Sequence, residues 1–243
     1  MILRNTLNFI NKSFENILKK FRKIYLSSEY YEKKISKFKN QNLIYKPSPH
    51  LLSSLINYQT KKINVDDIVT DNLWDNENIN VNNFKKLNNF YWFFSLDLKS
   101  SKKNTQNIVY EWIKKNFKYH SKSWEFDLTS KRIIAWLSNH NLTIENSDTE
   151  YLNLFNKVIQ KQTNHLINEV NHSKKVDNKI IGCAAIILVG ICYKDEKNYL
   201  TYGLNLLKKI SNTTFDNYGF PRSRNIKQLI FYLKYYILIR EWF

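Results

Sequence analysis

Apolar residues recur at three- and four-residue spacing along most of this chain, with polar residues between them. This is the periodicity of helices that bury one face and expose the other. After residue 82 one apolar stripe follows another, separated by short polar stretches. The stripes cover Phe84–Leu98, Ile108–Ile113, Leu128–Leu137, about Thr149–Val170, Lys179–Cys192, Lys197–Ile210 and Ile226–Phe243. The pattern predicts at least six helices, and Gly203 is expected either to face a neighbouring helix or to loosen its own.

Helices of this length joined by short loops pack as antiparallel neighbours, and repeated pairs curl into superhelices or close into toroids. Four Gly and three Pro in 243 residues are too few for the many turns of an all-β fold. The chain has no fixed-period repeat of the tetratricopeptide or ankyrin kind. We predict an all-α fold, an incomplete α/α toroid of antiparallel helix pairs. An irregular or short β segment is expected over residues 60–81, which include Ile63, Val65, Ile68, Val69 and Trp74.

The pattern over residues 2–26 predicts an amphipathic helix with a face rich in Lys and Asn. Its apolar stripe consists of Leu3, Leu7, Ile10, Phe14, Leu18, Phe21 and Tyr25. Such a helix either docks its stripe on the rest of the protein or binds a membrane surface or a partner; we expect docking. A weaker stripe follows over residues 28–45, and Lys46–Pro49 breaks it. We therefore expect a basic helical appendage over residues 1–46 and a main domain over residues 47–243.

The formal charge of +17 and the pI of about 9.6 have two explanations. One is a polyanionic partner, either nucleic acid or an acidic polysaccharide. The other is a composition rich in Lys, Asn and Ile, because the lysines are spread along the whole chain. No nucleic-acid-binding motif is present, so we do not expect nucleic acid as the partner.

Two cysteines, Cys183 and Cys192, lie nine residues apart in one apolar stretch and are expected to be reduced core residues. The most apolar run, Ile180–Cys192, is shorter than the ~20 residues of a membrane span. The segment Met1–Phe14 lacks a continuous apolar region and a small-residue cleavage site, so we do not expect a signal peptide, and the cytoplasm is the default compartment.

No self-sufficient catalytic, nucleotide-binding or metal-binding motif is present, and no cofactor is expected. The five histidines show no metal-ligand spacing. Aromatic residues make up 15% of the chain, and several surround one arginine. Trp112 and Trp136 lie on apolar stripes and are expected in the core, with Arg132 on the same helix face as Trp136. Trp124 is expected at a junction between a loop and a helix. Trp124 is a candidate for stacking on a sugar ring, and Arg132 for pairing with its carboxylate or sulfate.

The chain resembles the N-terminal helical domain of heparinase II/III family proteins over roughly residues 60–243. The resemblance is carried most specifically by the block Trp124–Leu137, in which an arginine precedes an aliphatic-Ala-Trp-Leu run. It also includes Phe90–Leu98, Trp112-Ile113, Gln162, Leu166, Asn178–Gly182, Gly219 and Ser223–Asn225. The family implies a helical toroid followed by a C-terminal β-sandwich, and we expect this chain to be truncated before the sandwich. Its active members cleave uronic-acid polysaccharides by β-elimination, which needs a neutralised carboxylate, a base and an acid.

Few of the catalytic residues of the family have a counterpart in this chain. Asn178 keeps the amide of the family's Asn-His pair, but Lys179 replaces the histidine. Gln228 stands where a tyrosine is common, and the sandwich histidine has no counterpart, so we expect the chain to be inactive as a lyase. The resemblance implies that Asn178 contacts the uronate carboxylate of an acidic polysaccharide and lies near two arginines at one end of the array. The other candidates for substrate binding are Trp124, Arg132, Tyr218, Arg222 and Arg224.

The alternative hypothesis is a non-catalytic helical module that binds an anionic glycan or another polyanion.

Overall fold

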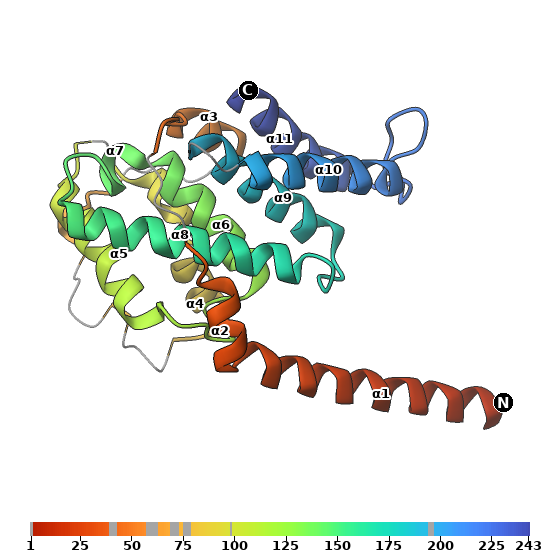
Figure 1. Ribbon diagram of the computed structural model, residues 1–243. Helices are drawn as coiled ribbons and strands as arrows, with labels where there is room; N and C mark the ends of the chain where they lie inside the picture. Colours follow the sequence, from red (N-terminus) through yellow and green to blue (C-terminus); the bar gives the residue numbers. More distant parts are fainter. Residues whose placement is uncertain are drawn as a thin grey trace.

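A computed structural model describes residues 2–38, 43–56, 63–68, 73–74, 79–97, 99–193 and 197–243 (Figure 1). Over these residues the fold is all-α, as the periodicity predicts, with packed helices and no β-strand. The α-helices are α1 (Ile2–Leu26), α2 (Glu29–Ile35), α3 (Pro49–Ile56), α4 (Val81–Asn88), α5 (Lys102–Asn116), α6 (Phe126–Ser138), α7 (His140–Thr143), α8 (Thr149–Glu169), α9 (Val176–Cys192), α10 (Lys197–Thr214) and α11 (Ile226–Trp242).

Several helices begin at a side chain that caps their first turn. Ser28, Asn80, Ser101, Asp148 and Asn225 each accept a hydrogen bond from a backbone N–H two or three residues later. These caps satisfy donors that have no partner inside the helix. Local sequence therefore fixes the starts of α2, α4, α5, α8 and α11.

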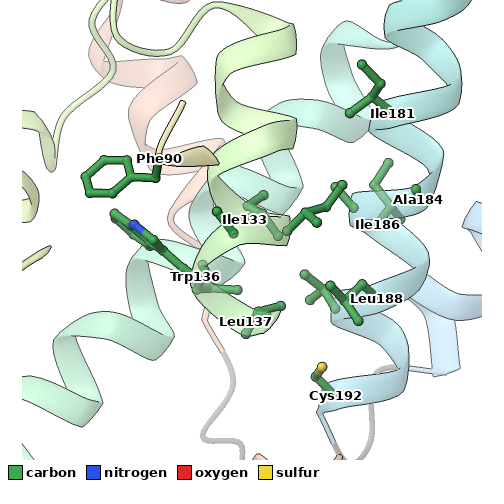
Figure 2. Packing of buried hydrophobic residues seen from close by; sticks show 14 of the residues in the cluster. Phe90, Ile133, Trp136, Leu137, Ile181, Ala184, Ile186, Leu188 and Cys192 are labelled. Atoms are coloured by element: carbon green, nitrogen blue, oxygen red, sulfur yellow. The ribbon is translucent and has the colours of Figure 1, made fainter. Parts of the chain in front are cut away.

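Helix α9 lies at the centre of the main domain and packs against α6, α8, α10 and α11. Its residues from Ile180 to Gly190 are all buried, because a helix that is apolar on every side needs neighbours on every side. Figure 2 shows Ile133, Trp136 and Leu137 of α6 beside the buried residues of α9. Trp112 and Trp136 are fully buried, which confirms their prediction as core residues.

Two of the small residues in the core allow close packing. A Cβ on Gly190 would lie 2.4 Å from the backbone nitrogen of Leu200, so α9 and α10 are in direct backbone contact there. A Cβ on Gly203 would lie 2.6 Å from a side-chain atom of Ile187, so Gly203 faces a neighbouring helix. Cys183 and Cys192 are buried and free, as expected. Among the helices of the described residues, none combines the length and the apolar character needed to cross a membrane.

One predicted helix is divided in the structure. The stripe expected over Phe84–Leu98 is split into α4 and a 3₁₀ helix over Tyr91–Ser95, and Leu98 lies outside the described residues. Phe90 separates the two with a left-handed backbone, at a φ of 58°. The ring of Phe90 is fully buried against Trp112 and Trp136, so tertiary packing stabilises a conformation that phenylalanine rarely adopts.

The segment expected to be irregular or short β is irregular where it is described. Ile63 forms an isolated parallel bridge with Leu96, and a 3₁₀ turn covers Val65–Asp67. Val69 lies outside the described residues.

The expectation that the stripe of α1 docks on the main domain is wrong for three of the described side chains, whereas Tyr25 is half-buried and packs against Tyr31. Phe14, Leu18 and Phe21 are 61%, 52% and 66% exposed, and α1 projects from the body of the molecule (Figure 1). The side chains of residues 2–13, which include Leu3, Leu7 and Ile10, lie outside the described part. The apolar anchor of the helix is at its end, where Leu26 joins a small core with Tyr31, Ile35 and Trp124.

Candidate functional site

A cleft with a volume of about 720 Å³ opens beside α4, at the end of α5. A turn at Trp74, helix α4 and the loop between α5 and α6 form its walls. Its lining combines aromatic, aliphatic and basic side chains: Trp74, Ile79, Val81, Phe84, Lys85, Lys115, His120, Ser121, Lys122 and Glu125. This volume lies within the ~300–1,000 Å³ typical of small-ligand sites.

The cleft continues into a smaller recess of about 130 Å³. The two share Trp74, Ile79, Phe84, Lys115 and His120. The recess is lined in addition by Leu73, Leu87, Asn88, Asn116 and Ser123. It therefore reaches from the open cleft to the buried residues that surround Arg132.

Arg132 lies directly behind this recess and is fully buried. Its Nη1 donates to the backbone oxygens of Asn88 and Ser123, at 2.9 and 3.0 Å, and both of these residues line the recess. Its Nε donates to Oε1 of Gln162 at 3.1 Å, and its guanidinium stacks 3.9 Å from the ring centroid of Trp112. It also lies on α6 with Trp136, at 5.9 Å from that ring centroid, as predicted.

The charge of Arg132 has no carboxylate partner among the described residues. All four of its hydrogen-bond acceptors are neutral, namely Gln162, Asn88, Ser123 and Thr129. Burial lowers the pKa of its guanidinium. A buried cation without a counter-ion favours an anion nearby, since its field is weakly screened in a low-dielectric interior. The positive field behind the recess thus favours a negatively charged group inside it.

The lysines of the cleft are held in different ways. Lys85 pairs with Glu125 at 2.7 Å, and this hydrogen-bonded pair raises the pKa of Lys85. The Nζ of Lys115 donates to the backbone oxygen of Trp74 at 2.6 Å and so fixes the turn that carries the indole. Lys122 is exposed at the rim, and no ion pair of the described residues includes it. Three lysines against one carboxylate give the cleft a positive lining.

The structure buries two of the residues expected to bind substrate. Trp124 is 1% exposed, and its Nε1 donates to the backbone oxygen of Asn116 at 2.9 Å. Arg132 is 0% exposed. Neither side chain has a surface that a glycan can contact in this structure. Both instead support the cleft from inside, because Asn116 and two of the acceptors of Arg132, Asn88 and Ser123, line the recess.

The other expected site residues lie elsewhere, on α9 and on the loop before α11. Asn178 is half-buried in the first turn of α9, whereas Tyr218, Arg222 and Arg224 are exposed. Arg224 pairs with Asp216 at 2.6 Å. Among the described residues no hydrogen bond or ion pair joins Asn178 to Arg222 or Arg224.

The starts of α9 and α11 nevertheless lie on the same side of the array (Figure 1). Their only described hydrogen bond between side chains runs from the hydroxyl of Tyr232 to Asp177 at 3.0 Å.

Sequence reasoning did not single out the residues that line the cleft. Trp74 stood in a segment expected to be irregular, and Lys115 and Lys122 looked like members of an evenly spread charge. The available signal was a tryptophan outside any helical stripe, since such a residue has no helix face to bury it. The described residues contain no group of His, Cys, Asp and Glu arranged to hold a metal ion.

Comparisons with protein-family models, curated proteins and solved structures find no match for this chain.

Proposed function

We propose that this chain is a helical module that binds an acidic sugar unit of an anionic polysaccharide in the cleft beside α4. The observation that carries the proposal is the joint lining of one cleft by Trp74, Phe84 and three lysines, with Arg132 behind it. Aromatic faces stack on the apolar faces of sugar rings, and ammonium groups pair with carboxylate or sulfate.

The geometry supports different roles for the residues that line the cleft. Trp74 rests on the buried Phe90, with ring centroids 5.3 Å apart, so its indole is supported from behind. Lys115 holds the backbone of Trp74 in place. Lys122 stands at the rim, where it is available to an incoming anion. The recess offers an acidic substituent a position that faces the field of Arg132.

The test is calorimetric titration of short heparan sulfate, hyaluronan and alginate oligosaccharides into the chain. Binding is expected to weaken as salt rises, because exposed charge pairs are screened. Lys122→Ala and Lys115→Ala should each raise Kd by about three- to tenfold, and Trp74→Ala by about tenfold. A neutral glucan of equal length should bind more weakly than the acidic sugars.

A matched lysine change separates this cleft from the net charge of the chain. Lys208 is exposed on α10, outside the cleft, so Lys208→Ala should leave Kd unchanged. If Lys208→Ala weakens binding as much as Lys122→Ala does, the affinity belongs to the overall charge and the proposal fails. Equal binding of a short nucleic-acid duplex at the same residues would show a general anion site instead.

The resemblance to heparinase II/III proteins raises a second hypothesis, a lyase built on an incomplete α/α toroid. The same oligosaccharides test it. β-Elimination produces an unsaturated uronate that absorbs in the ultraviolet. Our proposal is binding without cleavage, because Asn178, Arg222 and Arg224, which were expected to neutralise the uronate, do not line the cleft. An absorbance increase abolished by Asn178→Ala would replace the binding proposal with an active lyase.

A further inference from the structure

Helix α1 presents an apolar face that nothing in the described structure covers. Phe14, Ile17, Leu18, Phe21 and Ile24 are each at least 50% exposed. Their spacing of three and four residues places them on one side of the helix. Exposed large apolar side chains gathered in this way mark an interaction surface.

The helix is attached to the main domain by a different side. Glu15 pairs with Lys174 at 3.2 Å, Arg22 pairs with Glu169, and Leu26 is buried. These three residues of α1 are seven and four positions apart, so they lie on one side. The attachment leaves the apolar face exposed, with Leu18 and Phe21 at its edge lining an open hollow beside Tyr119.

The charge of α1 indicates what its apolar face meets. Lys19, Lys20 and Lys23 are exposed, and Glu15 is the one acidic residue from Ile2 to Leu26. The formal charge of the whole chain, α1 included, is +17. Apolar residues on one face and lysines on the other are the pattern of helices that lie at the interface of an anionic bilayer.

We propose that α1 binds the surface of an anionic lipid bilayer and lies in its plane. Phe14, Phe21 and the aliphatic residues between them enter the boundary between headgroups and acyl chains. The lysines stay at the headgroups, where long side chains keep their charge in water. Twenty-five residues give a helix about 37 Å long, and it projects from the domain (Figure 1).

A second copy of the chain fits this face less well. Pairing two α1 helices sets lysines against lysines, because no acidic residue borders the apolar face to complement Lys20. Leu18 also widens the face beyond the narrow seam of Phe14, Ile17, Phe21 and Ile24 that a coiled coil buries. Charge complementarity therefore favours an anionic surface over self-association.

The experiment is co-sedimentation of the full chain with phosphatidylcholine vesicles, with and without phosphatidylserine. Binding is expected to the mixed vesicles and to fall with salt. Phe14→Ala with Phe21→Ala should weaken partition at least about tenfold, because two apolar rings no longer leave water. Replacing Lys19, Lys20 and Lys23 by Gln should weaken it about fivefold for each lysine. Phe21→Trp adds a direct readout, a blue shift of fluorescence on binding.

Matched controls make the result specific to α1. Ile226→Ala with Ile230→Ala removes two exposed apolar residues from α11 and should leave binding unchanged. Circular dichroism should be the same for all variants, because the replaced side chains are exposed.

Equal binding to vesicles without phosphatidylserine, or no binding to either kind, overturns the proposal. So does a dimer in light scattering that Phe14→Ala with Phe21→Ala dissociates, because a second copy then covers the face. Oligosaccharide binding at the cleft is measured without lipid, so either proposal can fail while the other stands.

Discussion

His165 makes the stability of this fold sensitive to acid. It lies on α8, is 2% exposed, and connects α2 to the loop before α6. Its Nε2 is 2.9 Å from the backbone oxygen of Trp124, and its Nδ1 is 2.7 Å from the hydroxyl of Tyr31. A carbonyl only accepts, so Nε2 carries the proton and donates to it. Nδ1 is then the acceptor for the hydroxyl of Tyr31.

Protonation of this ring is opposed by its surroundings. Burial lowers the pKa of His165 from 6.5 to about 3, and the charges of Arg132 and Arg22 add to the effect against the opposing hydrogen bond to Trp124. A second proton on Nδ1 would also remove the acceptor that Tyr31 uses. The folded chain therefore keeps His165 neutral at pH values where the unfolded chain binds a proton.

The sign and size of the effect follow from this difference. Because the folded pKa lies below the unfolded one, the stabilisation is complete above pH 6.5 and is lost as pH falls toward 3. One proton bound only by the unfolded chain lowers the free energy of unfolding by about 1.4 kcal/mol per pH unit. Two units below 6.5, the loss attributable to His165 is about 3 kcal/mol.

The assay is urea unfolding at a series of pH values, for the wild-type chain and for His165→Gln. A glutamine side chain offers an N–H donor and an oxygen acceptor but does not titrate. The free energy of unfolding should therefore depend less steeply on pH, by the equivalent of about one bound proton. His172→Gln, at an exposed histidine, is the matched control and should keep the wild-type slope. If wild type and His165→Gln lose stability in parallel below pH 6.5, the assignment of this proton to His165 is wrong.

Two further changes probe the packing of the core. Gly190→Ala should lower the free energy of unfolding by about 1–3 kcal/mol, because the new Cβ meets the backbone of Leu200, an effect larger than the ~1 kcal/mol gain in helix propensity. Unchanged or higher thermal stability would contradict the backbone contact between α9 and α10. Trp136→Ala should cost about 3–5 kcal/mol in urea unfolding, because the indole is fully buried against Phe90 and Phe155. A loss below about 1 kcal/mol would contradict its place in the core.

The sequence by itself determined the class of the fold and most of its helices. Helix α1 ends at Leu26, the last residue of the predicted helix, and the central α9 is apolar on all sides. These features are local, because helix periodicity and side-chain caps act within a few residues. The burial of Trp112 and Trp136 followed from the same periodicity, since both lie on apolar stripes that the core must cover.

The candidate cleft was decided by contacts between segments far apart in the chain. Lys115 reaches the backbone of Trp74, and Arg132 reaches Asn88 across 44 positions. No local pattern encodes these contacts, so the sequence marked Trp124 and Arg132 as ligand-binding residues although the fold buries both.

The orientation of α1 was decided in the same way. Periodicity shows that one side of a helix is apolar, but it does not show which side the rest of the protein contacts. In α1 that choice was made by the ion pairs of Glu15 with Lys174 and of Arg22 with Glu169, which hold the helix by its polar side. The apolar stripe was a property of the sequence, whereas its exposure was decided by the tertiary structure, which attaches the helix through Glu15, Arg22 and Leu26 beside the stripe.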